Sequence, residues 1–275
     1  LETNFFDLDL SVPEIAKSVI SQMDYIIHLA DIVAGIDYVF KNQGNIFRQN
    51  LLINSNIIST CREFKENIKG FIYVGTACSF PLTRQNSLDV VPLHENELYP
   101  AMPESAYGWS KLMGQYETDL MEKETGIPTC TLMFHNVYGS PCDFGERSQV
   151  IPSLIRKAIN YPHEPFNVWG SGKPLRELIF VDDIADACIF FMKKKTVNYL
   201  INIGTGKDYT IRQYVQMLLK ILIPNKKIKI KYDLSKPNGT PKKVLDITLA
   251  KKYGWKPKSN FKKAIELTYK DFIEK

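Results

Sequence analysis

The 275-residue sequence has few cysteines, and none of the five lies in a CxxC pair. This spacing offers neither the closely paired thiols of a zinc site nor the dense, even set of a disulfide framework, so we expect no bound metal. No apolar run approaches the roughly 18 residues that a membrane span needs. The N-terminus also lacks the basic stretch of a signal peptide. These absences favour a cytoplasmic protein that does not bind membranes.

The composition is otherwise that of an average globular chain, with 44% hydrophobic and 24% charged residues, which excludes extended disorder. The net charge of +5 conceals an asymmetry, because residues 193–275 contain 21 lysines and arginines but only 6 acidic residues. Such a basic unit could bind a polyanion such as a diphosphate, or its lysines could simply be solvated. Nucleic acid is not expected, since the lysines lack interleaved aromatics and match no recognition module.

Short apolar runs alternate with helical patterns through the first two hundred residues. The strand candidates have the length and β-branched content of parallel strands buried on both faces, and they lie at residues 24–29, 70–74, 129–134 and 199–203. The helix candidates have a helical pattern or helix start and stop signals, and they lie at 45–63, 105–125 and 182–193. Because parallel strands need crossover helices, this alternation predicts an α/β fold with a Rossmann-like, doubly wound parallel sheet.

Turn-forming residues concentrate in two stretches, 141–176 and 207–275, which depart from this alternation. We therefore expect residues 1–140 and 177–206 to form the sheet domain, and the two stretches to form a smaller α/β lobe. Open α/β sheets bind ligands at the carboxyl ends of their strands, so the crevice between sheet and lobe is the expected site.

The first candidate for chemistry is the segment Tyr107-Gly-Trp-Ser-Lys111 on the expected long helix. A spacing of four residues places the phenol and the ammonium on one helical face. There the cation would lower the phenol pKa and allow proton exchange near neutral pH. The spacing alone is weak, because tyrosine and lysine are common on amphipathic helices.

Other polar groups follow the expected strands. Thr76 and Cys78 come directly after one strand, and Phe134 and Asn136 lie at the end of the next. Because the carboxyl ends of parallel strands meet at one edge, we expect Thr76 and Asn136 to face the same crevice as Tyr107. The alternative for Cys78 is a small buried hydrophobe, and the other four cysteines are expected to be structural.

Several motifs in one order resemble the extended short-chain dehydrogenase/reductase family, the NAD-dependent epimerases and dehydratases of nucleotide sugars. They are TACSFP, YGWSK, FHNVYG, VWGSGKPLRE, FVDDIADA, NIGTG and SKPNGTPKKVLD. Within the family they are most similar to GDP-L-fucose synthase and GDP-mannose 3,5-epimerase. The resemblance runs from about Phe5 to the C-terminus. It implies a nicotinamide cofactor, a nucleotide-diphosphate sugar as substrate, and a homodimer formed through the helix that carries Tyr107 and the helix before it.

The resemblance also implies catalytic roles. Tyr107 would be the general acid/base at the oxidised or reduced sugar carbon, Lys111 would lower its pKa and bind the nicotinamide ribose, and Thr76 would orient the same oxygen. Cys78 matches a cysteine that takes part in proton transfer during C3/C5 epimerisation. The acid partner of that cysteine in fucose synthase is a histidine, whose place is held here by Gln149. An amide cannot exchange a proton at neutral pH.

Binding residues follow from the same resemblance. Those for the nucleotide sugar are Asn136, Gln149, Lys157, Trp169, Arg176, Asn238 and Lys243. Those for the cofactor are Asp7, Leu8, Leu29, Ala30, Tyr107, Lys111, Phe134 and Asn136. Asp31 replaces an alanine in the family's Leu-Ala-Ala segment, which would place a negative charge near the pyrophosphate.

The sequence contains no GxGxxG or GxxGxxG motif, the glycine-rich turn that holds the pyrophosphate in this family. Since the first residue is not methionine either, we expect the chain to enter the sheet at the family's third strand, with the first two missing. The choice between NAD and NADP is then unreadable. The alternatives to a GDP-sugar epimerase/reductase are a 4-epimerase, a dehydratase, or a non-catalytic sugar-nucleotide-binding protein. Ala77-Cys78 stands in place of the dehydratase's Asp-Glu pair.

Overall fold

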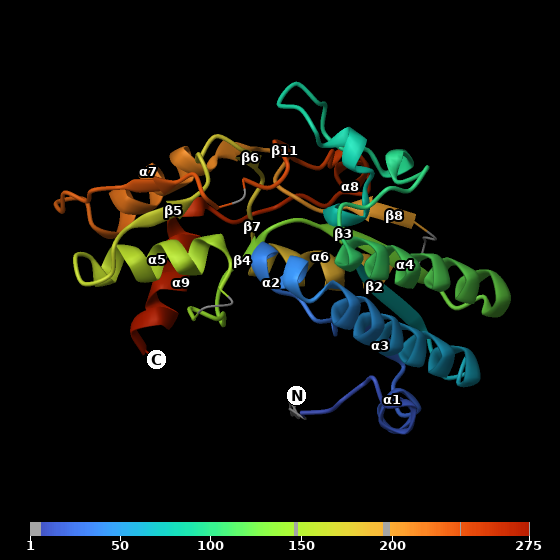
Figure 1. Cartoon of the computed structure of the whole chain (residues 1–275). Coiled ribbons are helices and arrows are strands. Elements are labelled where there is room, and N and C mark those ends of the chain that lie inside the picture. The colour runs from blue at the N-terminus through green and yellow to red at the C-terminus, as the bar shows by residue number, and fades with distance from the viewer. Residues whose placement is uncertain (1–6, 146–147, 195–198, 237, 275) are drawn as a thin grey trace.

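The computed structural model describes residues 7–145, 148–194, 199–236 and 238–274. Phe5 and Pro237, which belong to the segments of resemblance, lie outside the described residues. A parallel sheet with its covering helices lies beside a group of helices and short strands (Figure 1). Within the described residues, no helix is long and apolar enough to cross a membrane.

Four parallel strands form the main sheet. They are β1 (Tyr25–His28), β2 (Gly70–Thr76), β3 (Thr129–Phe134) and β8 (Tyr199–Asn202), in the spatial order β1-β2-β3-β8. The central strand β3 is buried along its whole length, as expected where both faces of a sheet are covered. The prediction of a doubly wound, Rossmann-like α/β sheet is confirmed.

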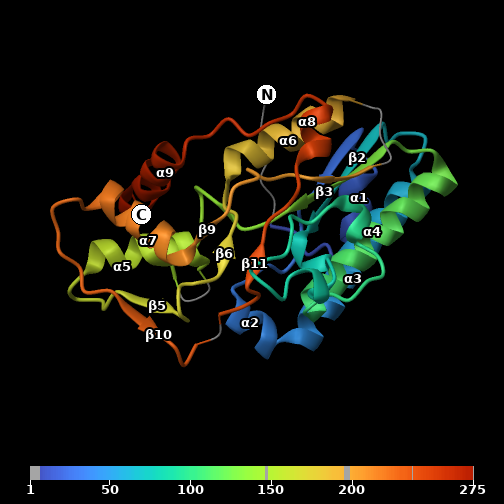
Figure 2. The ribbon, with the colours of Figure 1, turned by 90° about the horizontal axis from the view of Figure 1, so that it is seen from above.

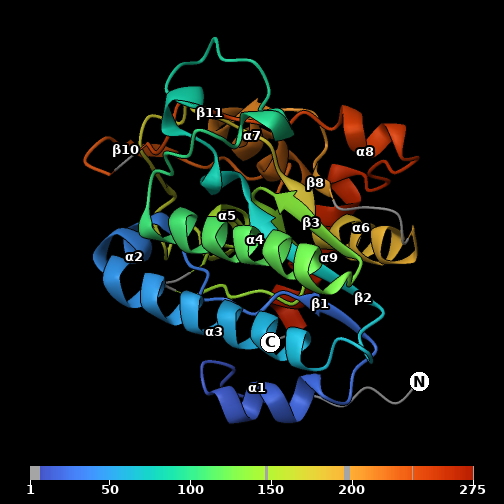
Figure 3. The same cartoon turned by 90° about the vertical axis from the view of Figure 1, so that its right-hand side faces the viewer.

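Helices lie on both faces of this sheet. α3 (Gln43–Glu63) and α4 (Ala106–Thr125) run side by side on one face, and α6 (Val181–Lys194) lies on the other (Figure 2). α1 (Pro13–Ile20) packs against α3 (Figure 3), and the short α2 (Ile36–Lys41) precedes α3.

The ends of α4 follow from its capping residues. Ser105 is the N-cap, and its hydroxyl accepts a hydrogen bond from the Gly108 N–H at 3.3 Å. Gly126 ends the helix with a φ of 74°, a left-handed conformation that glycine adopts without strain. The N-cap places Tyr107 in the first turn of α4, next to the end of β2.

The edge strand β1 departs from the prediction of strands buried on both faces. Ile26 and His28 are buried, whereas Tyr25 and Ile27 are 45% and 38% exposed. His28 contacts Asn54 of α3, so the buried side chains face the helices. The edge position leaves the other face partly open to solvent, and the expectation of two covered faces is wrong for this strand.

The second group of elements has its own hydrophobic core, which includes Ile155, Phe166, Tyr214 and Leu218. Its helices are α5 (Val150–Asn160), α7 (Ile211–Leu222) and α9 (Phe261–Glu274), while α8 (Thr248–Lys252) packs near β8. Its short strands pair as β4-β7, β10-β5 and β11-β6-β9. They are β4 (Val137–Tyr138), β5 (Asn167–Trp169), β6 (Leu175–Arg176), β7 (Ile179–Phe180), β9 (Tyr209–Thr210), β10 (Lys231–Asp233) and β11 (Lys242–Lys243).

Glu177 joins segments that are far apart in the sequence. Its fully buried carboxylate accepts hydrogen bonds from the Thr205 hydroxyl and the Gly206 N–H, after β8, and from the Leu245 N–H, after β11. Burial raises the pKa of this carboxyl, and the hydrogen bonds oppose the rise. Because Arg176 directly precedes Glu177, this anchor also fixes where Arg176 lies.

Candidate active site

Thr76 and Cys78 lie at the carboxyl end of β2. Thr76 is the N-cap of the 3-10 turn η1 (Ala77–Ser79), and its Oγ1 accepts a hydrogen bond from the Cys78 N–H at 3.2 Å. Two further short turns, η2 (Leu82–Arg84) and η3 (Glu95–Glu97), follow in the loop before α4. Thr76 is 7% exposed and Cys78 is partly exposed. One short turn therefore holds both the hydroxyl and the thiol.

The first turn of α4 packs directly on η1. The Ser79 hydroxyl donates a hydrogen bond to the Gly108 carbonyl at 3.1 Å. A Cβ atom at Gly108 would lie 2.3 Å from the Cys78 carbonyl oxygen, so only glycine permits this approach. The packing brings the Tyr107 hydroxyl into hydrogen-bonding reach of Thr76, and this bond lowers the phenol pKa.

The pKa of Tyr107 nevertheless lies above the ordinary value of a phenol. Burial raises it most, and the negative charges that Cys78 and Asp31 can carry raise it further. This direction is opposite to the one expected from the spacing of Tyr107 and Lys111. The reason lies in the position of the lysine.

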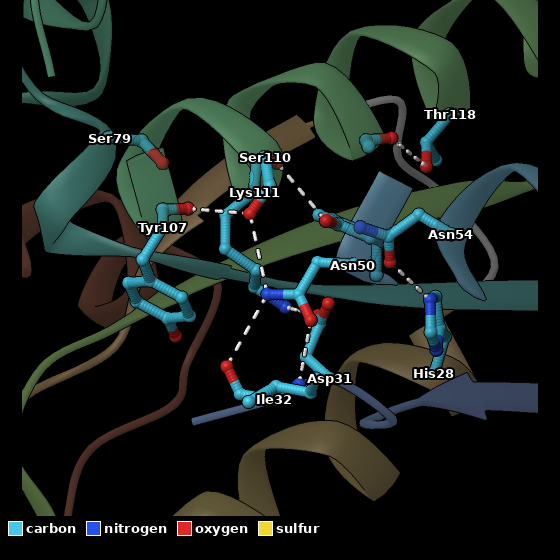
Figure 4. A network of polar contacts seen from close by, with 12 residues as sticks. His28, Asp31, Ile32, Asn50, Asn54, Ser79, Tyr107, Ser110, Lys111 and Thr118 are labelled. Carbon is cyan, nitrogen blue, oxygen red and sulfur yellow. Dashed lines mark hydrogen bonds and ion pairs between the residues drawn. The ribbon is translucent and has the colours of Figure 1, made fainter. Parts of the chain in front are cut away.

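Lys111 points away from Tyr107 into the interior of the sheet domain (Figure 4). Its Nζ forms an ion pair with the Asp31 carboxylate, and the two side chains are 3% and 1% exposed. The ammonium also lies 4.9 Å from the centre of the Tyr73 ring, in cation–π contact. Burial lowers the pKa of Lys111 and raises that of Asp31, and their mutual attraction opposes both changes. The negative charge that Asp31 brings to this region is therefore paired with the Lys111 ammonium.

Two asparagines of α3 extend this buried network. Asn50 Oδ1 accepts a hydrogen bond from the Ile32 N–H at 2.7 Å, and its Nδ2 lies 3.4 Å from Ser110 Oγ on α4 (Figure 4). Asn54 Oδ1 lies 2.6 Å from His28 Nε2. These contacts fix the segment after β1 against α3 and α4. Neither asparagine was predicted from the sequence, where polar residues four positions apart on an otherwise amphipathic helix were the available signal.

Lys243 brings a positive charge to the thiol of Cys78. Its Nζ lies 3.5 Å from Cys78 Sγ and 3.8 Å from a carboxylate oxygen of Glu104, and the residue is 5% exposed. His135 is also buried, and burial, Lys243 and Arg176 lower its pKa well below that of a free imidazole. His135 is therefore neutral. Glu104 was not predicted, since nothing in the loop before α4 marked it.

Arg176, on β6, contacts Asn238, in the loop before β11. Arg176 Nη2 donates a hydrogen bond to the Asn238 carbonyl at 3.3 Å, and Asn238 Oδ1 accepts one from the Ser171 N–H at 2.7 Å. In the parallel pair of β6 and β11, Arg176 stands beside Lys243. The structure thus brings together three of the predicted substrate residues. Trp169, at the end of β5, is 45% exposed.

Other predicted residues lie apart from this cluster or use their polar groups elsewhere. Gln149 is exposed at the start of α5, and the Lys157 ammonium donates to the Asn167 carbonyl at 2.9 Å. Asn136, with a φ of 41°, donates from Nδ2 to the Glu177 carbonyl at 3.1 Å. Phe134 is buried at the end of β3. Among the described residues, Cys78 has its charged neighbour in Lys243, and the Lys157 ammonium is used by the Asn167 carbonyl.

The residues predicted to bind a dinucleotide cofactor suit its nicotinamide end. Tyr107 and Thr76 place two hydroxyl groups together at the carboxyl end of β2, which suits a nicotinamide and the oxygen that reacts beside it. Leu8 and Leu29 are 41% and 58% exposed, Asp7 is exposed and Ala30 is partly buried. Lys111 is turned inward, and the sequence has no glycine-rich loop for the pyrophosphate.

Comparison with known proteins identifies the family of the chain. Residues 1–204 match the NAD dependent epimerase/dehydratase family. GDP-L-fucose synthase 1 of Arabidopsis thaliana is 29% identical over an alignment of 278 residues, which covers 98% of this chain and 83% of the relative. GDP-mannose 3,5-epimerase of the same plant is 29% identical over 276 residues, covering 98% and 71%. The crystal structure of UDP-glucose 4-epimerase (TM0509) from Thermotoga maritima has a TM-score of 0.85 and 24% identity, covering 98% and 84%.

The two relatives are those that the sequence motifs indicate, so the predicted resemblance is confirmed. The family match includes Thr76, Cys78, Tyr107 and Lys111. Enzymes of this family depend on a nicotinamide dinucleotide, NAD or NADP. The chain is therefore an enzyme that belongs to the NAD dependent epimerase/dehydratase family.

Proposed function

We propose that the protein is an epimerase/reductase of a GDP-linked sugar, with redox chemistry at C4 and C3/C5 epimerisation beside it. The observation that carries the proposal is the contact of the β2 turn with α4, which gathers Tyr107, Thr76 and Cys78, with Lys243 beside the thiol. Similarity to GDP-L-fucose synthase and GDP-mannose 3,5-epimerase supports the nucleotide and the chemistry.

Tyr107 is the proton donor or acceptor for the C4 oxygen in this proposal. The Thr76 hydroxyl bonds the phenol, so the same sugar oxygen can be held by both groups. A bound nicotinamide cofactor would supply or accept the hydride at C4. In reduction the protonated phenol would give its proton to the C4 oxygen, and in oxidation the phenolate would take it back.

Cys78 exchanges a proton at a carbon next to the C4 ketone. The ketone makes that C–H bond acidic, so the thiolate removes the proton and leaves an enolate, which takes a proton back on either face. A lysine ammonium 3.5 Å from the sulfur stabilises a thiolate and can return a proton. Gln149 stands where fucose synthase has its histidine, and its side-chain amide cannot act as an acid at neutral pH. In this proposal Lys243 takes the role of that histidine.

We also propose that residues 141–176 and 207–275 form the lobe that binds the sugar nucleotide, and that residues 1–140 and 177–206 form the dinucleotide domain. Arg176 and Asn238 would bind the diphosphate, because a guanidinium matches an anion that leaves water. Lys243 was predicted for the same role and stands beside Arg176, but in this proposal its ammonium serves the Cys78 thiol. Asn136, Gln149, Lys157 and Trp169 would complete the sugar-nucleotide site.

The first experiment separates this proposal from its alternatives. Calorimetric titration with NAD, NADH, NADP and NADPH is expected to show binding, and incubation with GDP-mannose or a GDP-linked 4-keto sugar in D₂O is expected to give a product labelled at C3 or C5. Redox at C4 without label would indicate a reductase or 4-epimerase. Binding of GDP-sugar without any dinucleotide would instead indicate a non-catalytic binding protein.

A second experiment tests Lys243 without cofactor or substrate. The rate of Cys78 alkylation by iodoacetamide, resolved from the other cysteines by peptide mass spectrometry, is expected to fall at pH 7 in Lys243→Gln, because the ammonium 3.5 Å from the sulfur is removed. Lys242→Gln is the matched control, because that neighbouring lysine lies 3.9 Å from Asp208 instead. Equal rates in the wild type and Lys243→Gln would contradict the assigned role.

We propose further that the protein is a homodimer in which α3 and α4 of one copy pack on those of the other. An open apolar hollow of about 410 Å³ lies over these helices, and its lining residues are Gln43, Phe47, Ala106, Trp109 and Met113. Trp109 and Tyr116 on α4 are 38% and 52% exposed. A second copy of the same face would cover these aromatic side chains.

A further inference from the structure

Glu104 lies beside Lys243 in the candidate site and has no part in the chemistry proposed above. It directly precedes Ser105, the N-cap of α4, so its backbone is fixed where that helix begins. One of its carboxylate oxygens lies 3.8 Å from Lys243 Nζ, and the side chains of Glu104 and Lys243 are 23% and 6% exposed. Glu104 and Cys78 therefore share one nearly buried ammonium.

The backbone around Lys243 is held from two sides. β11 pairs with β6, and the residues that follow β11 bond to Leu93 in the loop before α4 (Figure 2). The Leu93 N–H donates to the Val244 carbonyl at 2.9 Å, and the Asp246 N–H donates to the Leu93 carbonyl at 2.9 Å. The loop that fixes this strand also carries Glu104 at its end, so the carboxylate and the ammonium are both placed by ordered backbone.

Among the described residues, the charged and titratable groups that face the Lys243 ammonium are Cys78 on η1, Glu104 before α4, Arg176 on β6 and His135 after β3. His135 is neutral, because burial and the two cations lower its pKa. Arg176 is a second cation; burial lowers its pKa, and the charges of Cys78 and Glu104 oppose this change. When the thiol of Cys78 is neutral, Glu104 supplies the negative charge of this group.

The charge on Cys78 changes during the proton exchange proposed above. The thiolate takes a proton from the carbon, the electron pair of the C–H bond passes to the C4 oxygen of the enolate, and the sulfur becomes neutral. The Lys243 ammonium then gives a proton to the opposite face of the enolate, and the resulting amine takes the proton of the thiol. This transfer restores the thiolate and the ammonium. While the sulfur is neutral, a buried ammonium beside a guanidinium is costly unless another anion accompanies it.

We propose that Glu104 is a positioning residue that keeps Lys243 as an ammonium beside Cys78 while the sulfur carries no charge. The inference rests on the proposed function, because it concerns the proton exchange at that site. The carboxylate keeps its charge through the exchange, so it stabilises the ammonium in both states of the sulfur. It also favours transfer of the thiol proton to the neutral amine, which completes the exchange.

The first test needs neither cofactor nor substrate. The protonation of Lys243 is followed through the carbon-13 chemical shift of its Cε atom from pH 6 to 11, with the signal assigned by its loss in Lys243→Arg. Glu104→Gln is expected to move the midpoint of this titration to lower pH by about one pH unit or more, because the ammonium loses a counter-charge about 4 Å away. Glu104→Asp keeps the charge and should recover part of the change.

The same titration in a Cys78→Ser background isolates the carboxylate, because a serine hydroxyl at this position remains neutral. Glu104→Gln is expected to lower the midpoint there as well. Glu97→Gln is the control, because it removes a carboxylate of the same loop that pairs with Arg84 instead. An unchanged Lys243 midpoint in Glu104→Gln would overturn the inference.

The second test measures the exchange itself. Formation of the deuterium-labelled, inverted sugar in D₂O is followed from pH 6 to 10 in the wild type and Glu104→Gln, with circular dichroism as the check of the fold. We expect the alkaline limb of the profile to move to lower pH in the variant, since the ammonium that protonates the enolate is lost earlier. An unchanged alkaline limb in a folded variant would contradict the assigned role.

The two tests separate the inference from the function on which it rests. If the wild type forms no labelled sugar, the proposed epimerisation fails, and the role of Glu104 in the exchange fails with it. The titration of Lys243 then still decides whether Glu104 holds the ammonium. Failure of the inference alone would instead leave the exchange intact and its pH profile unchanged in Glu104→Gln.

Discussion

His28 makes the stability of the protein depend on pH. Burial, aided by the charge of Lys111, lowers its pKa to about 3, from 6.5 for a free imidazole. Between these values the unfolded chain binds a proton that the folded chain excludes, so the free energy of unfolding falls as the pH falls. Each pH unit below 6.5 lowers it by about 1.4 kcal/mol. From pH 7.5 to pH 5 the loss from His28 alone is therefore about 2 kcal/mol, a figure that holds for any folded-state pKa well below 5.

Urea unfolding at the two pH values, followed by tryptophan fluorescence, measures this loss. His28→Gln keeps an amide that can donate to Asn54 but carries no titrating group, so its loss is expected to be about 2 kcal/mol smaller than that of the wild type. His163→Gln is the control, because it makes the same substitution at an exposed imidazole. The same loss in His28→Gln as in the wild type would refute the reasoning.

Three further predictions concern Tyr107, the buried carboxylate of Glu177 and the proposed dimer interface. Tyr107→Phe is expected to lower turnover by at least about 100-fold with an unchanged circular dichroism spectrum, and Tyr116→Phe on the same helix is expected to retain activity; retained activity in Tyr107→Phe would contradict the mechanism. Glu177→Ala removes the acceptor of three hydrogen bonds. The free energy of unfolding, measured by urea titration, should fall by about 3 kcal/mol or more. A fall of less than about 1 kcal/mol would contradict this prediction. Trp109→Glu should convert a dimer to a monomer in light scattering after size exclusion, and a wild-type monomer would argue against the proposed interface.

The sheet domain could be predicted because its signals are local. The strand at 129–134 and the end of the helix at 125 agree with the structure, since apolar runs, a serine cap and a terminal glycine act over a few residues. The exposure of Tyr25 and Ile27 could not be predicted in the same way. Whether a strand lies at an edge depends on its neighbours in space.

The inward direction of the Lys111 side chain could not be predicted from the sequence, for a related reason. Its spacing from Tyr107 gives the helical face but not the direction of a long side chain. That direction is set by Asp31, which is 80 positions away in the sequence. The substitution of Asp31 for an alanine was visible, yet its partner became evident only where β1, α3 and α4 meet.

In the basic C-terminal third, strand register decides which lysine reaches the site. Lys242 and Lys243 are adjacent and chemically identical, but successive side chains of a strand point to opposite sides. The pairing of β11 with β6 places Lys243 beside Arg176 and the thiol of Cys78, whereas Lys242 lies near Asp208. A charge count cannot separate two such residues. Loss of thiol reactivity in Lys243→Gln but not in Lys242→Gln is therefore expected from the register alone, and it would assign part of the basic excess to a single buried ammonium.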